Sequence, residues 1–376
     1  MNNSTTSVFQ RYQSRAELLQ EFAPAGPAIE RIICPIWYTI GFIGNPISAF
    51  VWLGQRMRRN NSSAVYLGAL SLSDLLFIFL HLLFFLHTSW GLDIYNDYVS
   101  CEIFHFLYYV PQYLSTFLVL GFTAERYVAV CHPFFKEKLC TVQRAFIIVL
   151  CLTFFSILLS SVQIYIWTYS DAEGTCNIRP EAGANDDTSF WNIWGWVTDI
   201  LAFVLVPLIV LVINVLVLRE IFRISKNDVM RRQNSRSGNN AASTVTLLAV
   251  SFYLIVTQIS ATVVACLQQA FPTGDIFMTD DEIRNDKTWS NVFTYMEVRR
   301  IIEVVCLSHY ACYFLIYCLT GKHFRKQAIY LITFRGRVSC LSSLVSKKHR
   351  KEQYSMVSTN NGHNSETCVT SFSTTI

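Results

Sequence analysis

Residues 144–167 read RAFIIVLCLTFFSILLSSVQIYIW, and this stretch decides the class of fold. Its only charged residue is Arg144, at the first position. A helix needs about 20 mostly apolar residues to cross a hydrocarbon layer roughly 30 Å thick, because each residue rises about 1.5 Å. The stretch is therefore predicted to be a membrane-spanning helix.

Six further apolar stretches lie on either side of it, and the seventh is the weakest because it contains Arg299, Arg300 and Glu303. The composition agrees with a membrane protein, since only 15% of the 376 residues are charged, against about a quarter in soluble domains. We expect an all-α membrane protein, a seven-transmembrane helix bundle. Its spans are predicted at Ile32–Gln55, Ala64–Leu86, Ile103–Tyr127, Arg144–Trp167, Ile193–Leu218, Thr244–Leu267 and Met296–Cys318.

The basic residues fix the orientation, because Lys and Arg concentrate in cytoplasmic segments. With the N-terminus outside, 22 of the 30 basic residues lie inside. The predicted organisation is an extracellular segment at 1–31, the bundle at 32–318, a short amphipathic eighth helix at 321–335 and a disordered cytoplasmic tail at 336–376. No cleavable signal peptide is expected, since the polar N-terminus leads into a first span that acts as an anchor.

The acidic residues follow the opposite distribution. Nineteen of 26 lie outside or at the outer helix ends, and six lie inside. One interpretation is that acidic loops keep the outer surface soluble. The other is an electrostatic field that attracts a cationic ligand, since such potentials raise encounter rates with opposite charges.

The cysteines fit the same topology. Cys101 starts the third span on the oxidising side, and Cys176 lies in the second outer loop. A disulfide between them would pin that loop over the helix mouth. Asn2 and Asn3 each begin an N-x-S/T sequon on the outer segment, so glycosylation is expected there.

Polar residues inside the spans are functional candidates, because they are costly to place in a membrane. Asn45, Asp74 and Ser115 lie at similar depths in the first three spans, and we expect one buried polar cluster. The alternatives are a structural hydrogen-bond network and a cation or proton held by Asp74.

The inner end of the third span carries Glu125-Arg126-Tyr127. A Glu beside an Arg at the membrane edge can pair locally and hold the Arg until a partner competes for it, which would make a two-state latch. An interfacial Arg whose side chain reaches back to water is the ordinary alternative.

Polar and aromatic residues near the outer mouth are candidate ligand contacts. Asp199 shares a helical face with Trp196 and Phe203, and it has no basic residue at helical spacing. Self-neutralising pairs with Arg299 or Arg300 are the alternative for Glu303. The candidate set is Tyr108, Gln112, Trp196, Asp199, Gln258 and Glu303.

These features together resemble the rhodopsin-like (class A) G-protein-coupled receptors. The resemblance covers nearly all of residues 30–335. It depends on the seven spans, the outer N-terminus, Gly44-Asn45, the Asp74 segment and Glu125-Arg126-Tyr127 with Cys101 placed 25 residues before Arg126. It implies a ligand-driven helix rearrangement that opens an inner cavity for a heterotrimeric G protein, with Tyr317 as part of the switch.

Three phrases are similar to the neuropeptide-receptor branch, notably FMRFamide-receptor-like and thyrotropin-releasing-hormone-receptor-like proteins. They are GNPISAFVW (44–52), ERYVAVCHP (125–133) and FLIYCLTG (314–321). Tyr108 stands where amine receptors carry Asp, and Leu307 stands where opsins carry the retinal Lys, so both of those ligand classes are disfavoured.

The chain also departs from the family pattern. Ile255-Val256-Thr257-Gln258 replaces the sixth-span Cys-Trp-x-Pro, so a straighter sixth helix is expected. Tyr313-Phe314 replaces the Asn-Pro of the seventh span. Asp74 and Ser115 match two members of the family's sodium site, but His309 and Tyr313 replace its asparagines. The resemblance therefore implies an incomplete sodium site, and no other cofactor is expected.

The tail supplies further expected partners. Phosphorylation of its Ser and Thr residues would recruit a receptor kinase and arrestin, as the family resemblance implies. The terminal Thr374-Thr375-Ile376 fits a peptide that adds a strand to a PDZ domain. Residues after Gly321 form an amphipathic helix suited to an anionic lipid surface.

The predicted function is a plasma-membrane, multi-pass receptor for a short, basic extracellular peptide that activates a G protein. No catalytic motif, metal-ligand spacing or nucleic-acid partner is indicated. A transporter would show an internal repeat or paired broken helices, and neither is seen. The remaining alternative is a non-signalling or constitutively active seven-helix binder or scaffold, which the altered sixth and seventh spans would permit.

Overall fold

The computed structural model describes residues 6–12, 15–59, 61–171, 174–183, 189–230 and 238–333. Within them, seven helices are long and apolar enough to cross a membrane. The predicted seven-helix bundle is thereby confirmed. The helices extend several residues beyond most of the predicted spans, as do Tyr98–Cys131 and Lys287–Thr320.

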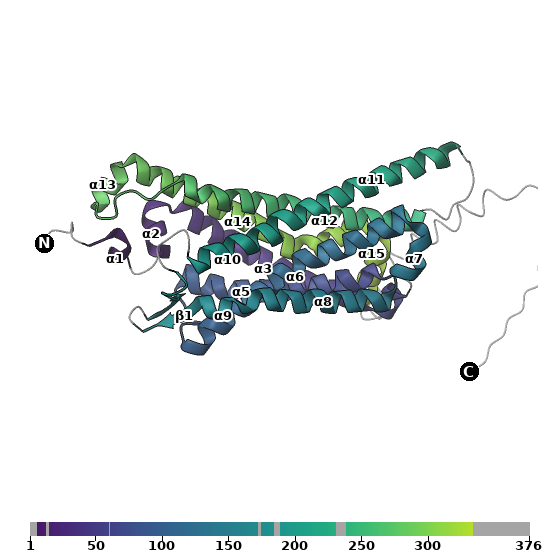
Figure 1. The fold of residues 1–376 in the computed structure, drawn as a ribbon, viewed down its shortest axis with the longest axis horizontal. Coiled ribbons are helices and arrows are strands. Elements are labelled where there is room, and N and C mark those ends of the chain that lie inside the picture. The colour runs from purple at the N-terminus through teal and green to yellow at the C-terminus, as the bar shows by residue number, and fades with distance from the viewer. Residues whose placement is uncertain are drawn as a thin grey trace, which may run out of the picture. The chain divides into compact units, whose positions relative to one another are not determined.

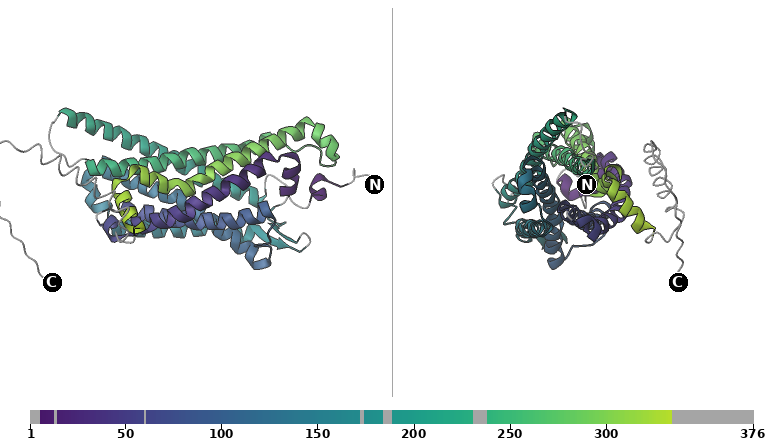
Figure 2. Two further views of the ribbon diagram at one scale, coloured as in Figure 1. Left: turned by 180° about the vertical axis from the view of Figure 1, so that it is seen from behind. Right: turned by 90° about the vertical axis from the view of Figure 1, so that its right-hand side faces the viewer.

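The spanning helices lie side by side along a common direction (Figures 1 and 2). In chain order they are α3 (Ala25–Leu53), α5 (Ser63–Trp90), α6 (Tyr98–Cys131), α8 (Val142–Ser161) continued by α9 (Gln163–Ile166), α10 (Phe190–Asp199) continued through the π-helical segment η2 (Ile200–Leu205) into α11 (Val206–Met230), α12 (Gly238–Cys266) and α14 (Lys287–Thr320).

Short elements connect the spans. They are α1 (Val8–Arg11), α2 (Arg15–Phe22), α4 (Gln55–Arg58), α7 (Pro133–Leu139), the antiparallel hairpin β1 (Trp167–Ser170) with β2 (Thr175–Ile178), the 3₁₀ turn η3 (Leu267–Ala270), α13 (Asp280–Asn285) and α15 (Lys322–Ile332). The bundle belongs to a compact unit that ends at Arg325. Helix α15 begins where the eighth helix was expected, and its place at a membrane surface stays a prediction.

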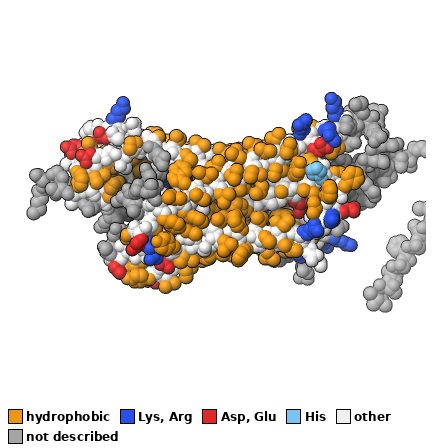
Figure 3. All heavy atoms as spheres, viewed as in Figure 1, with side chains coloured by type: hydrophobic (Ala, Val, Ile, Leu, Met, Phe, Trp, Pro, Cys, Tyr) orange, Lys and Arg blue, Asp and Glu red, His pale blue; other side chains and the backbone are white. Residues whose placement is uncertain are grey.

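The bundle surface is apolar along its middle. Figure 3 shows hydrophobic side chains over the central part of the helices, with charged side chains gathered at the two ends. Helix α8 is an example, since Leu150 and Phe154 expose 67% and 63% of their surface. So large an apolar surface is unfavourable in water, and lipid is its natural solvent.

The interior is held by close approach of α3 to α14 and α5. A Cβ on Gly44 would lie only 2.7 Å from the Cβ of Phe314, so glycine is what lets these two helices meet. Next to this contact lies a cluster of buried side chains from three helices: Cys34, Tyr38, Phe77, Ile78, Phe85, Val304, Leu307, Tyr310 and Ala311.

The extracellular N-terminal segment contains two helices that were not predicted. Helices α1 and α2 fold onto α13 and the outer end of α14, and Val8 N donates to the carbonyl of Ile276 at 2.7 Å. Leu18, Leu19, Trp289 and Phe293 belong to the shared apolar cluster. The prediction missed these helices because their apolar residues are too few to indicate a core without their distant partners.

Candidate functional site

The outer end of α6 is joined to the hairpin by a disulfide. Cys101 and Cys176 are bonded, which confirms the predicted bridge. The amide of Cys176 also donates to Asn96 Oδ1 at 3.1 Å. Arg179, just after β2, forms an ion pair of 3.1 Å with Glu102 of α6. These contacts fix the second outer loop against the end of α6.

Asp199 ends α10, and the π-helical segment begins at the next residue. Such irregular turns often mark functional sites in helices. The Asp199 side chain is exposed. Its charge interacts with Arg299 of α14 and with the hydroxyls of Tyr109 and Tyr113 of α6. Three helices thus contribute to the surroundings of one carboxylate.

Arg299 lies between two acidic residues of the outer mouth. It forms an ion pair of 2.7 Å with Glu303, one turn along the same helix. The self-neutralising alternative for Glu303 is therefore what the structure shows. Arg300 pairs with Glu30 of α3 at 3.5 Å, and not with Glu303.

The other candidate ligand contacts lie deeper or further out. Tyr108 packs among Phe77, His81, Phe84 and Phe104, with ring centroids 5.4–6.3 Å apart. Gln112 is half-buried one turn below it, and Trp196 is exposed near the outer end of α10. Gln258 is buried beside the Tyr310 side chain.

Most outer basic residues whose side chains are described already have acidic partners. Arg11, Arg179, Arg284, Arg299 and Arg300 form ion pairs with Asp280, Glu102, Glu21, Glu303 and Glu30, respectively. Among the described residues, Asp199 has no cation within ion-pair distance. Asp199 therefore keeps its charge unpaired at the outer mouth, whereas the charge of Glu303 is offset by Arg299.

The buried polar cluster forms as predicted for two of its members. The Ser115 hydroxyl lies 2.7 Å from Asp74 Oδ1 and 2.9 Å from the hydroxyl of Ser73. Asn45 instead donates to the carbonyl of Tyr310 at 2.9 Å. Sequence reasoning missed Ser73, which joins α5 to the backbone of α6 at Pro111.

Several buried polar atoms around this cluster have no protein partner within the described part of the chain. They are Asn45 Oδ1, Ser48 Oγ, Asp74 Oδ2, His309 Nε2, Tyr313 Oη and Tyr317 Oη. Buried polar groups are costly unless they are satisfied. Water or a small cation would complete such a site.

The inner latch differs from the expected local pair. Arg126 Nη2 donates to Ser63 Oγ at 2.7 Å and to Asn61 Oδ1 at 3.3 Å. Glu125 accepts from Ser62 at 2.8 Å and from Ser63 at 2.7 Å. No direct Glu125–Arg126 ion pair within 4.0 Å is present between these two described side chains. The start of α5 therefore holds both residues, and Ser63 lies between them.

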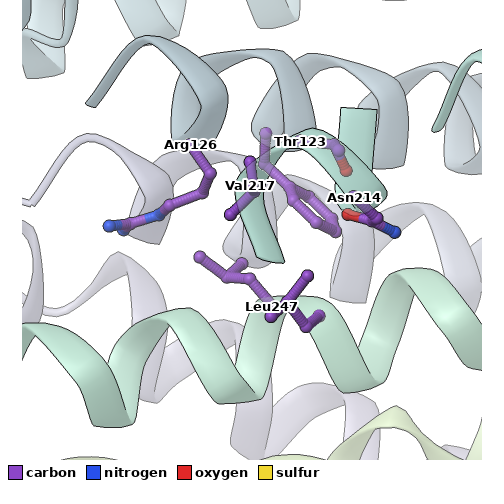
Figure 4. Close-up of a pocket in the computed structure, with 7 residues that line it drawn as sticks. Thr123, Arg126, Asn214, Val217 and Leu247 are labelled. Atoms are coloured by element: carbon purple, nitrogen blue, oxygen red, sulfur yellow. The ribbon is translucent and has the colours of Figure 1, made fainter. Parts of the chain in front are cut away.

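A small pocket opens beside this latch, between α6, α11 and α12. Its cavity volume is about 10 Å³, and its lining is Phe122, Thr123, Arg126, Asn214, Val217, Leu247 and Leu248. Figure 4 shows the Arg126 guanidinium directed away from the other labelled residues. That direction agrees with its bonds to α5.

Two inner features went unrecognised in the sequence. Ser62 and Ser63 belong to a polar stretch at a loop end, and nothing in their spacing indicates Glu125 or Arg126. Phe134 is 96% exposed on α7, in the loop that follows α6. No sequence signal indicates this exposure, because single apolar residues at a surface are normal.

Seven spanning helices, an outer hairpin pinned by a disulfide and an arginine restrained at the inner end define a membrane receptor of the seven-helix class. The sequence profile described as "7 transmembrane receptor (rhodopsin family)" matches residues 44–301. The chain belongs to this family. It is therefore a multi-pass plasma-membrane signalling receptor and not an enzyme.

Named relatives are similar at low identity. The chain is 24% identical to the human C-C chemokine receptor type 1 over 298 residues, covering 77% of this chain and 75% of that receptor. It is 29% identical to the Gallus gallus thyrotropin-releasing hormone receptor over 160 residues, 39% of each chain. It is 30% identical to the Mus musculus neurotensin receptor type 1 over 110 residues, 27% of this chain and 25% of that receptor.

Proposed function

We propose that the chain is a G-protein-coupled receptor for an extracellular peptide that presents a basic group. Membership of the rhodopsin family supports the receptor part of this proposal. The relatives are receptors named for chemokines, thyrotropin-releasing hormone and neurotensin, which supports a peptide-class ligand. The observation that supports a basic group on the ligand is Asp199. This outer carboxylate is exposed and forms no ion pair with the neighbouring arginines.

The surroundings of Asp199 suit a cation on a short side chain or an N-terminal amine. On the α6 side, the half-buried Tyr109 ring lies within the electrostatic reach of Asp199, and aromatic faces attract cations. Arg299, on the α14 side, is occupied by Glu303. A basic ligand group would therefore meet the Asp199 carboxylate, with the nearby cation Arg299 already paired with Glu303.

On the inner side, the proposal needs a switch that a G protein can bias. Arg126 is held by Ser63 and Asn61 and lies at the edge of the pocket between α6, α11 and α12. A partner that offered acceptors in that pocket would compete with Ser63 and Asn61 for the guanidinium. The exposed Phe134 gives the same partner an apolar anchor on α7.

Regulatory partners belong to the same proposal. A receptor kinase and arrestin would act on the Ser and Thr residues of the tail, and a PDZ domain would bind at Ile376. These segments, and the sequons at Asn2 and Asn3, lie outside the described residues. A sodium ion at Asp74 is also a proposal, supported by the unpartnered Asp74 Oδ2 and Asn45 Oδ1.

The test is nucleotide exchange on a panel of Gα proteins, in membranes bearing the full chain, with and without a library of short amidated peptides. Arg126→Ala, compared at the same surface expression, is the negative control, called the blank below. Exchange that depends on a basic peptide and disappears in the blank is the expected result. Exchange driven equally by acidic peptides would overturn the proposed basic ligand group.

A second candidate function is a non-signalling or constitutively active seven-helix binder or scaffold. It is favoured by one observation: α12 runs without interruption through Val256 and Gln258, which stand where the family carries its switch Trp and Pro. The same experiment separates the two candidates. Peptide binding without exchange on any Gα would favour the binder, and peptide-independent exchange would favour constitutive activity.

A further inference from the structure

The guanidinium of Arg299, near the outer end of α14, is held at two of its nitrogens. Nε donates to Glu303 Oε1 at 2.7 Å, one turn further along the same helix. Nη1 donates to Gln268 Oε1, in the 3₁₀ turn η3 that follows α12. A guanidinium is planar and rigid, so two bonds at different nitrogens fix its direction.

A third residue, Tyr295, brings these partners together. Its hydroxyl interacts with Arg299 from one turn before it on α14. The same hydroxyl donates to the carbonyl of Val264 of α12 at 2.8 Å, and the ring stacks on Phe271 with centroids 4.8 Å apart. Phe271 directly follows η3, so Tyr295 fixes the segment that carries Gln268 against α14. We call Glu303, Gln268 and Tyr295 the Arg299 clamp.

The next residue, Arg300, belongs to a different contact. It pairs with Glu30 of α3 at 3.5 Å. Its Cβ packs so closely on α3 that a Cβ on Gly26 would lie 3.3 Å from it. The charge of Arg299, in contrast, interacts with that of Asp199 of α10. The two consecutive arginines therefore act at different helices, and Arg299 is the one near the candidate ligand carboxylate.

Two carboxylates thus compete for the Arg299 guanidinium. Glu303 holds it at 2.7 Å, whereas Asp199 lies beyond ion-pair distance and interacts with it only through space. Opposite charges attract over such separations, and a long arginine side chain changes direction readily when nothing holds it. The clamp decides this competition in favour of Glu303, and Asp199 stays unpaired.

We propose that the Arg299 clamp sets the charge preference of the outer site. Glu303 and Gln268 act as positioning residues: they keep Arg299 away from Asp199, so that Asp199 is left for a cationic group of the ligand. This inference rests on the proposed function for the identity of that ligand. Without the clamp, Arg299 would neutralise Asp199, and the site would treat a basic peptide and its neutral counterpart alike.

The test compares matched peptides on the full chain in membranes, at equal surface expression. Each active basic peptide of the amidated library is paired with a neutral counterpart. In the counterpart, citrulline replaces Arg, norleucine replaces Lys and acetylation removes the N-terminal charge. The readout is the charge preference, which is the concentration for half-maximal nucleotide exchange of the neutral peptide divided by that of the basic peptide.

Glu303→Gln should lower the charge preference by about 3- to 10-fold, a moderate change because partly exposed ion pairs contribute less than buried ones. Adding Arg299→Gln to Glu303→Gln should restore the parent preference, since no internal cation is then left to neutralise Asp199. Removing a second residue would not rescue a merely structural defect. An unchanged preference in Glu303→Gln, or a loss that Arg299→Gln does not restore, would overturn the proposal.

Gln268→Ala tests the clamp from its other side. Gln268 is exposed on η3, so its replacement is compatible with folding if Glu303→Gln does not reach the surface. The charge preference should fall in the same direction, and Arg299→Gln should again restore it. A Gln268→Ala receptor with the parent preference would remove Gln268 from the clamp and contradict its assigned role.

Glu297→Gln is the matched control for the loss of one negative charge from α14. The Glu297 carboxylate accepts from the amide of Ala25 at 3.0 Å and has a separate role from the clamp. The substitution should leave the preference within about twofold of the parent, as expected for a surface charge. A fall equal to that of Glu303→Gln would assign the effect to the general charge of the outer surface and not to the clamp.

A second measurement needs no ligand and separates this inference from the proposed function. A parent receptor without any preference for basic peptides would refute the proposed ligand group. Thermal unfolding in detergent then decides whether the clamp exists, through a double-mutant cycle. Asp199→Asn should lower the unfolding midpoint more in the Glu303→Gln background than in the parent, because Arg299 pairs with Asp199 only there. Equal shifts in the two backgrounds would show that Glu303 does not keep Arg299 from Asp199.

Discussion

Arg126 of α6 donates a 2.7 Å hydrogen bond to the hydroxyl of Ser63 at the start of α5. The same hydroxyl donates a 2.7 Å hydrogen bond to Glu125 Oε1. One serine therefore satisfies both the acid and the base of the inner motif, and it is only 1% exposed. The restraint on Arg126 in the described structure comes from a neighbouring helix and not from the adjacent residue.

Ser63→Ala should release Arg126 and raise peptide-independent nucleotide exchange. A hydrogen bond to a charged group contributes about 1.5–3 kcal/mol, so a population change of about 10- to 100-fold is expected. The measurement is basal exchange per surface receptor. Ser63→Thr keeps the hydroxyl and should behave as the parent, and Ser62→Ala removes only a bond to Glu125. Equal basal exchange in Ser63→Ala and the parent would show that Ser63 does not restrain the switch.

Asp199→Asn should weaken a basic peptide without lowering surface expression. The substitution keeps the shape of the side chain and removes the charge, so a charge-assisted contact is lost and about 10- to 100-fold in potency is expected. The measurement is the peptide concentration for half-maximal exchange. Asp281→Asn, on the exposed face of α13, is the control for the general field of the outer surface. A similar loss of potency in both variants would show that the peptide responds to the overall negative charge of the outer surface and not to Asp199.

Lowering the pH should destabilise α13, because Glu282 becomes protonated. The amide and hydroxyl of Thr279 donate to this carboxylate in a capping box, and they hold the pKa of Glu282 below its ordinary value. A lowered folded-state pKa stabilises the helix above the unfolded pKa of about 4.3. That stabilisation is lost as pH falls through the still lower folded value.

Hydrogen exchange of the amides at 280–285, corrected for the intrinsic rate at each pH, measures this effect. Protection should fall on acidification in the parent chain. Glu282→Gln can form the same capping box without titrating, so its protection should stay flat with pH. A parallel fall in both proteins would assign the change to another group.

Replacing Cys101 and Cys176 by Ser should destabilise the receptor. The bridge closes a loop with a sequence separation of 75, and loss of a native disulfide typically costs about 2–5 kcal/mol. The measurement is the midpoint of thermal unfolding in detergent. Cys151→Ser, on the exposed face of α8, is the matched control and should leave the midpoint unchanged. An unchanged midpoint in the double variant would show that Asn96 and Arg179 hold the hairpin by themselves.

The sequence by itself determined the seven spans, their number and their orientation. Apolar runs such as residues 144–167 encode a membrane helix locally, because the backbone satisfies its own hydrogen bonds within the segment. The disulfide was predictable for a related reason, since orientation left Cys101 and Cys176 as the clear pair on the oxidising side. Asp74 and Ser115 followed from their depth in neighbouring spans.

Tertiary structure alone decided which residues meet. The fold of α1 and α2 depends on Trp289 and Phe293, which are more than 250 positions away in the chain. No local sequence pattern therefore indicates it. The restraint of Arg126 by Ser63 and the pairing of Arg300 with Glu30 join different helices, and they depend on side-chain directions that spacing leaves open. Hydrophobicity is a local property that places a helix in the membrane, whereas a hydrogen bond between helices requires the relative rotation of both, which only packing sets.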